Sequence, residues 1–267
     1  MPSTADVNAL QGAIAAPAIF PSLKDRVVFI TGGGSGIGES LVEHFCAQGA
    51  KVAFVDIAAA PSQALADRIA AKGHPKPLFQ PCDLRKIEDL RACIDKVRKE
   101  LGPIRVLVNN AGNDDRHATA DVTVEYWDDR IAVNLRHQFF AAQAVRPQMR
   151  DAGGGAIINF GSISWHLGLP DLLLYETCKA GIEGMTKALA RELGPDNIRV
   201  TAVVPGNVKT ERQAQWYTPE GEAEIVRQQC LKARLEPDHV ASLVLFLASD
   251  DGRMCTGHGY WIDAGWR

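Results

Sequence analysis

The chain has 267 residues, of which 46% are hydrophobic, and a formal net charge of −3 at pH 7. This length suits one large domain with a packed core, and so small a net charge gives no electrostatic reason to expect nucleic acid or a membrane surface as a partner. Because no apolar run reaches the roughly 18 residues that a transmembrane helix needs, we expect no membrane span.

Residues 1–23 form an N-terminal extension before the first predicted strand. We do not expect a signal peptide, because the first lysine is Lys24 and Pro17 interrupts the apolar stretch. The six cysteines contain no C-x-x-C pair, which is typical of reduced thiols in a cytoplasmic protein. The seven histidines show no H-E-x-x-H or similar spacing, so we expect no metal site.

From residue 26 onward, short apolar runs alternate with helical patterns. The predicted strands are 26–31, 51–56, 77–82, 104–109, 155–161, 198–204 and 259–263. The predicted helices are 36–49, 61–72, 86–101, 121–149, 173–193 and 236–249. This alternation predicts an α/β fold, a single-domain Rossmann-like doubly wound parallel sheet of about seven strands with helices on both faces. We therefore expect ligands at the carboxyl ends of the strands.

A glycine-rich turn, Gly32-Gly-Gly-Ser-Gly36-Ile-Gly38, lies between the first predicted strand and the first predicted helix. Glycines at such a turn allow the backbone to approach a pyrophosphate closely, and the helix N-terminus supplies N–H donors and a positive dipole. A flexible turn without a ligand is the alternative. The strand–turn–helix context favours a dinucleotide site.

Asp56 ends the second predicted strand, about 20 residues after the glycine turn. A carboxylate there can accept hydrogen bonds from the adenosine ribose, and it would repel a 2′-phosphate. The next residues, Ile57-Ala-Ala-Ala, contain no arginine or lysine to receive that phosphate. We therefore predict NAD rather than NADP, although Asp56 could instead only cap the following helix.

Tyr175 and Lys179 lie four residues apart on a predicted helix, so their side chains share one face. A nearby ammonium group favours the phenolate, and lowering a phenol pKa from about 10 to about 7 requires roughly 4 kcal/mol. A tyrosine adjusted in this way could act as a general base. An ordinary pair on a helix surface is the alternative.

Four motifs together resemble the short-chain dehydrogenase/reductase family over residues 24–267: Gly32-x-x-x-Gly36-x-Gly38, Asn109-Asn-Ala-Gly112, Tyr175-x-x-x-Lys179 and Pro205-Gly206. The resemblance implies that Tyr175 is the general base and that Lys179 depresses its pKa. It also implies that Ser162 orients the substrate oxygen and that Asn134 holds a water that relays protons to Lys179. Ser164 is the competing candidate for the serine.

The resemblance further implies an NAD site in which Asp83 and Leu84 flank the adenine. The expected cofactor contacts are Gly32, Gly34, Ser35, Gly36, Ile37, Gly38, Asp56, Ile57, Asp83, Leu84, Asn110, Ala111, Gly112, Tyr175, Lys179, Pro205, Gly206, Val208 and Thr210. The family also suggests a homotetramer, with the last strand and helix 236–249 at one interface. Trp266 would then be buried between subunits or cover a neighbour's active site, the alternative being a frayed tail.

The segment 207–235 fits no strand, and so long a connection favours a substrate lid. Two polar and aromatic stretches, 113–117 and 164–168, favour a polyhydroxylated substrate, although Asp115 and Arg116 could form a surface ion pair and His117 could be exposed. The candidate substrate contacts are Asn113, Ser162, Ser164, Trp165, His166, Tyr175, Asn207 and Trp216.

Longer strings, among them NAGNDDRH, PGNVKTERQ and CTGHGYWIDAGWR, resemble bacterial aldose 1-dehydrogenases within this family. The resemblance implies NAD-dependent oxidation of D-xylose or L-arabinose at C1 to the lactone, in non-phosphorylative pentose breakdown. D-galactose is not distinguished from these sugars. The alternatives are another polyol or small carbonyl substrate, a 3-oxoacyl reductase, which Asp56 disfavours, and a dinucleotide-binding regulator without chemistry.

Overall fold

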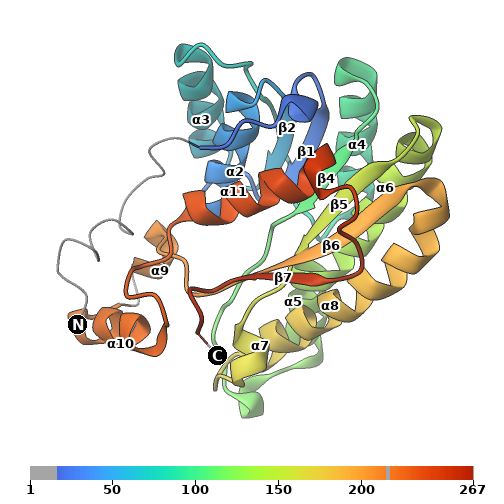
Figure 1. Cartoon of the computed structure of the whole chain (residues 1–267). Helices are drawn as coiled ribbons and strands as arrows, with labels where there is room; N and C mark the ends of the chain where they lie inside the picture. Colours follow the sequence, from blue (N-terminus) through green and yellow to red (C-terminus); the bar gives the residue numbers. More distant parts are fainter. Residues whose placement is uncertain (1–16, 215–216, 267) are drawn as a thin grey trace.

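The computed structural model describes residues 17–214 and 217–266. Its centre is a seven-stranded sheet in the order β3-β2-β1-β4-β5-β6-β7, with every neighbouring pair parallel (Figure 1). The strands are β1 (Val27–Thr31), β2 (Lys51–Asp56), β3 (Leu78–Pro81), β4 (Val106–Asn109), β5 (Gly155–Phe160), β6 (Ile198–Pro205) and β7 (Gly259–Ile262). The predicted fold class is confirmed.

Helices cover both faces of this sheet (Figure 1). They are α2 (Gly36–Ala47), α3 (Ala59–Ala71), α4 (Ile87–Leu101), α5 (Val124–Ile131), α6 (His137–Asp151), α7 (Ser164–Leu167), α8 (Leu173–Leu193), α9 (Glu211–Ala214), α10 (Pro219–Gln228) and α11 (Pro237–Ala248). The short turns are η1 (Pro21–Leu23), η2 (Thr119–Asp121), η3 (Ala132–Arg136), η4 (Gly194–Asp196) and η5 (Asp250–Gly252).

The alternation of side chains along each strand creates two hydrophobic cores. Val28 and Ile30 of β1 pack in one core with buried residues of α2, α3 and α11. Phe29, between them in the sequence, packs in the other core with α4, α6 and α8. Successive strand residues point to opposite faces, so a near-continuous apolar run is what a strand covered on both sides requires. Leu23 of η1 is fully buried in the first core.

The predicted helix 121–149 is divided. It begins at Val124, where the side chain of Thr123 accepts a hydrogen bond from the Tyr126 N–H, and η3, a π-helical turn, separates α5 from α6. A π turn inserts one residue into the helical repeat and is frequent at functional sites. Asn134 lies in this turn, and its Nδ2 donates to the Arg130 carbonyl at 3.1 Å. Apolar periodicity could not reveal a single inserted residue.

The segment between β6 and α11 carries α9 and α10, which lie to one side of the sheet, apart from the helices on its faces (Figure 1). A single parallel bridge between Val208 and Leu235 closes this segment at its base. In the part of the chain that the structure describes, no helix combines the length and apolar character needed to cross a membrane.

Candidate active site

A cavity of about 630 Å³ lies at the carboxyl ends of β1 to β6. Of the predicted site residues, the following line it: Gly32, Ser35, Gly36, Ile37, Gly38, Asp56, Ile57, Asp83, Leu84, Asn110, Ala111, Gly112, Asn113, Ser162, Ser164, Tyr175, Lys179, Pro205, Gly206, Asn207, Val208 and Thr210. Trp266 also lines it, together with a second cavity of about 320 Å³. The parallel topology therefore brings together motifs that are distant in the sequence.

The glycine turn leaves backbone exposed at one end of this cavity. Gly32 has a φ of +66°, and a β-carbon on Gly38 would lie 1.8 Å from the Gly32 carbonyl oxygen. A side chain on Gly38 would push α2 away from the end of β1, and one on Gly32 would meet the Ala111 Cα at 2.9 Å. The turn therefore lets the backbone come close to a dinucleotide pyrophosphate and offers it the free N–H groups of the α2 N-terminus, so the residues present fit such a group.

Asp56 lies beside the glycine turn, and backbone N–H groups hydrogen-bond both of its carboxylate oxygens. Its Oδ2 accepts from the Gly34 N–H and its Oδ1 from the Ala58 N–H, each at 2.9 Å. Gly34 thus positions Asp56, although Gly34 itself does not line the cavity. The nearby Arg85 guanidinium, which also lines the cavity, already pairs with Asp83 and Asp129.

Tyr175 and Lys179 project from α8 into the cavity opposite Ser162, which follows β5. The Ser162 hydroxyl accepts the Ser164 N–H at 3.1 Å and also hydrogen-bonds Tyr175. The Lys179 ammonium donates to the Phe160 carbonyl at 2.7 Å and lies 5.2 Å from the centre of the Tyr175 ring. Serine, phenol and ammonium therefore form one cluster.

Asn134 lies behind the cavity wall and does not line it. Its Oδ1 accepts from the Asn113 N–H at 2.7 Å. A β-carbon on Gly112 would lie 3.3 Å from this oxygen and 3.4 Å from the Lys179 Nζ, so both atoms adjoin the same backbone position. The π turn thus holds the loop that follows β4 beside the Tyr175–Lys179 cluster.

Burial has a strong effect on the electrostatics of this cluster. Burial raises the pKa of Tyr175 above its usual value, and the Asp114 carboxylate raises it further, while the Ser162 hydrogen bond and the Arg212 charge lower it. Burial also lowers the pKa of Lys179 to about 8. Burial therefore has the largest effect on the phenol of the chain by itself, and the lowering of the Tyr175 pKa by Lys179 stays a prediction.

Burial of Lys179 makes stability depend on pH. Its pKa falls from the usual 10.5 to about 8, so between these values the unfolded chain holds a proton that the folded chain has released, and stability rises with pH. Lys179→Met should lack this rise. At about 1.4 kcal/mol per pKa unit, we expect its stability relative to wild type to fall by about 2–3 kcal/mol between pH 7 and pH 10.

Urea unfolding of both proteins at several pH values measures this difference. Lys187→Met is the matched control, because Lys187 lies on the exposed side of the same helix. Identical pH dependence of Lys179→Met and wild type would contradict the role of burial.

The candidate substrate residues divide into two groups. Asn113, Ser164 and Asn207 line the cavity, and among the described residues the buried Ser164 hydroxyl has no hydrogen-bond partner. Trp165 and His166 instead turn to Glu183 of α8: the Trp165 Nε1 lies 2.8 Å and the His166 Nε2 3.2 Å from the Glu183 Oε1. The structure does not bring these two to the cavity lining.

Trp216, the remaining candidate, lies outside the described residues. His166 lines the second, smaller cavity, where its ring packs 4.2 Å from that of Trp261.

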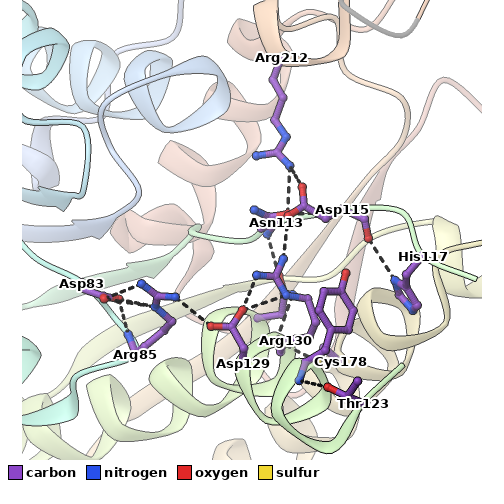
Figure 2. Close-up of polar contacts among 12 residues, drawn as sticks. Asp83, Arg85, Asn113, Asp115, His117, Thr123, Asp129, Arg130, Cys178 and Arg212 are labelled. Carbon is purple, nitrogen blue, oxygen red and sulfur yellow. Dashed lines mark hydrogen bonds and ion pairs between the residues drawn. The ribbon is translucent and has the colours of Figure 1, made fainter. Parts of the chain in front are cut away.

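The sequence did not predict three arginines that line the cavity, Arg85, Arg130 and Arg212. Arg212 of α9 reaches back to the loop after β4, where it contacts Asn113 and Asp115 (Figure 2). Asp115 also pairs with Arg130 at 2.9 Å. Figure 2 shows that the ion pairs continue from Arg130 through Asp129 and Arg85 to Asp83. The acidic run after Asn113 could be recognised in the sequence as a candidate for charged contacts. Its partner Arg212 lies nearly a hundred residues later, and nothing in the sequence around it indicates this pairing.

Comparisons with known proteins agree with this geometry. A family model described as Enoyl-(Acyl carrier protein) reductase matches residues 32–267. The D-xylose 1-dehydrogenase of Caulobacter vibrioides (strain NA1000 / CB15N) is 66% identical over 250 residues, covering 94% of this chain and 99% of that protein. A Rhizobium meliloti (strain 1021) protein named "Probable galactose dehydrogenase GalD" is 52% identical over 247 residues, covering 92% and 96%.

Among solved structures, a 7α-hydroxysteroid dehydrogenase complexed with NADH and 7-oxo glycochenodeoxycholic acid matches with a TM-score of 0.88 and 27% identity. The match covers 92% of this chain and 96% of that one. With the glycine turn, the Asn-Asn-Ala-Gly loop and the Tyr175–Lys179 pair meeting at one cavity, the chain belongs to the short-chain dehydrogenase/reductase family, oxidoreductases that transfer hydride to or from a nicotinamide cofactor.

Proposed function

We propose that the protein oxidises an aldose, D-xylose or L-arabinose with D-galactose as a further candidate, at C1 to the sugar lactone. The observation that carries the substrate class is the 66% identity to a D-xylose 1-dehydrogenase over 94% of the chain. The cavity supports it, because polar side chains such as Asn113, Ser164 and Asn207 line its wall. Polyhydroxylated substrates need such hydrogen-bond partners.

In the proposed reaction, Tyr175 removes the proton of the C1 hydroxyl as general base. Ser162 would stabilise the charge that develops on the substrate oxygen. Its oxygen accepts the Ser164 N–H, and its own proton, which donates to Tyr175 in the structure, would turn to the substrate oxygen when the sugar binds. Lys179, anchored on the Phe160 carbonyl, places a positive charge near the phenol. A bound oxidised nicotinamide would supply the hydride acceptor, and its positive charge would favour the phenolate.

Asn134 fits a positioning role. Its Oδ1 holds the Asn113 backbone at 2.7 Å and adjoins the Lys179 ammonium across Gly112. It would hold the water that passes protons to Lys179 and would also keep the loop after β4 in place.

NAD is the proposed cofactor. The exposed glycine turn would receive its pyrophosphate, Asp56 its adenosine ribose, and Asp83 with Leu84 its adenine, since all of these line the cavity. The ordered Asp56 carboxylate disfavours a 2′-phosphate by charge repulsion. The Arg85 guanidinium is engaged by two carboxylates and does not offset that repulsion.

The surrounding architecture carries three further proposals. Residues 24–267 form one catalytic domain in which the segment 207–235 is the lid, since α9 contacts the loop after β4 through Arg212. The protein forms a homotetramer, because β7 at the sheet edge and α11 beside it offer a surface for pairing. It works in the cytoplasm, which agrees with the six free thiols.

The test is a panel of free aldoses and acyclic polyols, each with NAD and with NADP, followed by formation of the reduced cofactor. We expect fast turnover of an aldopentose with NAD and accumulation of the lactone. Reduction of acetoacetyl-CoA with NADPH is the comparison for a 3-oxoacyl reductase. Cofactor binding without turnover of any aldose would refute the sugar assignment and direct the search to other polyols and small carbonyl compounds.

A further inference from the structure

We propose that Asp114 is the residue that recognises the sugar, accepting hydrogen bonds from two neighbouring ring hydroxyls while Arg212 and Gln213 of α9 hold its carboxylate in place. This inference rests on the proposed aldose function and assigns its selectivity to a residue of the same cavity. It follows from the contacts of Asp114, its position and its effect on the neighbouring Tyr175.

Asp114 lines the cavity with Tyr175 and Ser162, and its side chain is 32% exposed. Its Oδ1 accepts from the Arg212 Nε at 3.1 Å and its Oδ2 from the Gln213 Nε2 at 2.8 Å. An ionised carboxylate has about four acceptor positions, so each oxygen keeps one for another donor. Two adjacent hydroxyls of a sugar ring present two donors side by side and match this arrangement.

The position of Asp114 is fixed from both sides. The preceding residue, Asn113, donates its N–H to Asn134, and its own Oδ1 accepts from the Asp115 N–H at 2.9 Å and from Arg212 at 3.0 Å. Asp115 is held in turn by Arg130 (Figure 2). A carboxylate held in this way needs little ordering when a ligand binds, which favours affinity.

The charge of Asp114 acts against the proposed proton transfer. Its carboxylate raises the pKa of Tyr175, whereas its partner Arg212 lowers it. A negative charge beside a general base makes its phenolate form harder to reach. A carboxylate in the cavity therefore needs another role that favours the reaction, such as binding of the substrate. Binding of sugar hydroxyls is that role, and a substrate without these hydroxyls would experience only the unfavourable charge.

Two substrates separate these effects: the preferred aldopentose and 2-hydroxytetrahydropyran, the cyclic hemiacetal that keeps the reacting carbon and lacks the other hydroxyls. For Asp114→Asn we expect kcat/KM for the pentose to fall about 10–100-fold, the size of a lost charge-assisted hydrogen bond. With 2-hydroxytetrahydropyran we expect kcat/KM to stay the same or rise. The ratio of the two values is therefore the measured quantity.

Asp115→Asn is the matched control, because it removes the same charge from the same loop and from the same partner Arg212, while Asp115 is absent from the residues that line the cavity. It should change both substrates equally and leave the ratio as in wild type. An equal loss for both substrates in Asp114→Asn would overturn the proposal and assign Asp114 to lid structure.

A second measurement uses wild-type enzyme with deoxy derivatives of the sugar, so it does not depend on whether a variant folds. Wild-type enzyme should lose a similar factor for each of two adjacent deoxy derivatives of the pentose, and a uniform response to deoxygenation at every position would also overturn the proposal. Failure of the aldose function itself has a different signature, namely that wild-type enzyme turns over no aldose at all.

Discussion

Replacement of Tyr175 by phenylalanine is expected to lower kcat about 10²–10⁴-fold, the usual contribution of a general base, with cofactor affinity changed by no more than a few-fold. In the proposed reaction the phenol oxygen contacts the substrate hydroxyl, and its removal leaves the ring in place beside Lys179. Initial rates with the preferred aldose and a titration of NADH binding by fluorescence measure the two effects separately.

Tyr126→Phe provides the control for Tyr175→Phe. Tyr126 lies in the first turn of α5, with its ring 5.3 Å from that of His117 and under the Arg130 guanidinium, and it is absent from the cavity lining. We expect its kcat to remain close to wild type. Turnover that survives in Tyr175→Phe would mean that another group removes the proton.

Replacement of Asp56 by asparagine is expected to raise KM for NAD about 10–100-fold, as expected for the loss of a charge-assisted hydrogen bond to the ribose. KM for NADP should fall at the same time, because the repulsion of its 2′-phosphate is removed. Asparagine keeps the shape and one acceptor for the backbone N–H groups of Gly34 and Ala58. The ratio of kcat/KM for the two cofactors is the quantity to measure.

Asp67→Asn tests whether any lost charge on the neighbouring helix has the same effect. Asp67 lies on α3, exposed and paired with Lys76, so we expect its cofactor ratio to equal that of wild type. A wild-type enzyme that prefers NADP, or an Asp56→Asn variant with an unchanged ratio, would refute the role of Asp56 in cofactor choice.

The sequence predicted the sheet and its ligand-binding edge well. The predicted strand 51–56 coincides with β2, and the predicted helix 173–193 coincides with α8. Both depend on local properties: the period of apolar residues and the special backbone of glycine. Because the carboxyl ends of parallel strands meet at one edge, the glycine turn, Asp56 and Ser162 could be placed together without coordinates.

Other features required the folded chain. The π turn at Asn134 adds one residue to a helix whose apolar pattern gives no sign of it. Trp165 and His166 follow β5 closely in sequence, yet the short helix α7 turns them to Glu183. Their side-chain directions depend on packing that a sequence pattern does not contain.

The sequence by itself determined which strands, turns and reactive side chains this protein has, because these depend on residues close together in the chain. Only the tertiary structure decided the charges at the reacting centre. The pairing of Asp114 with Arg212 joins residues 98 positions apart, and the burial of Tyr175 and Lys179 moves both pKa values toward the neutral forms. Desolvation and long-range ion pairs depend on the distances between atoms in the folded chain, and those distances arise only when α9 and the loop after β4 come together.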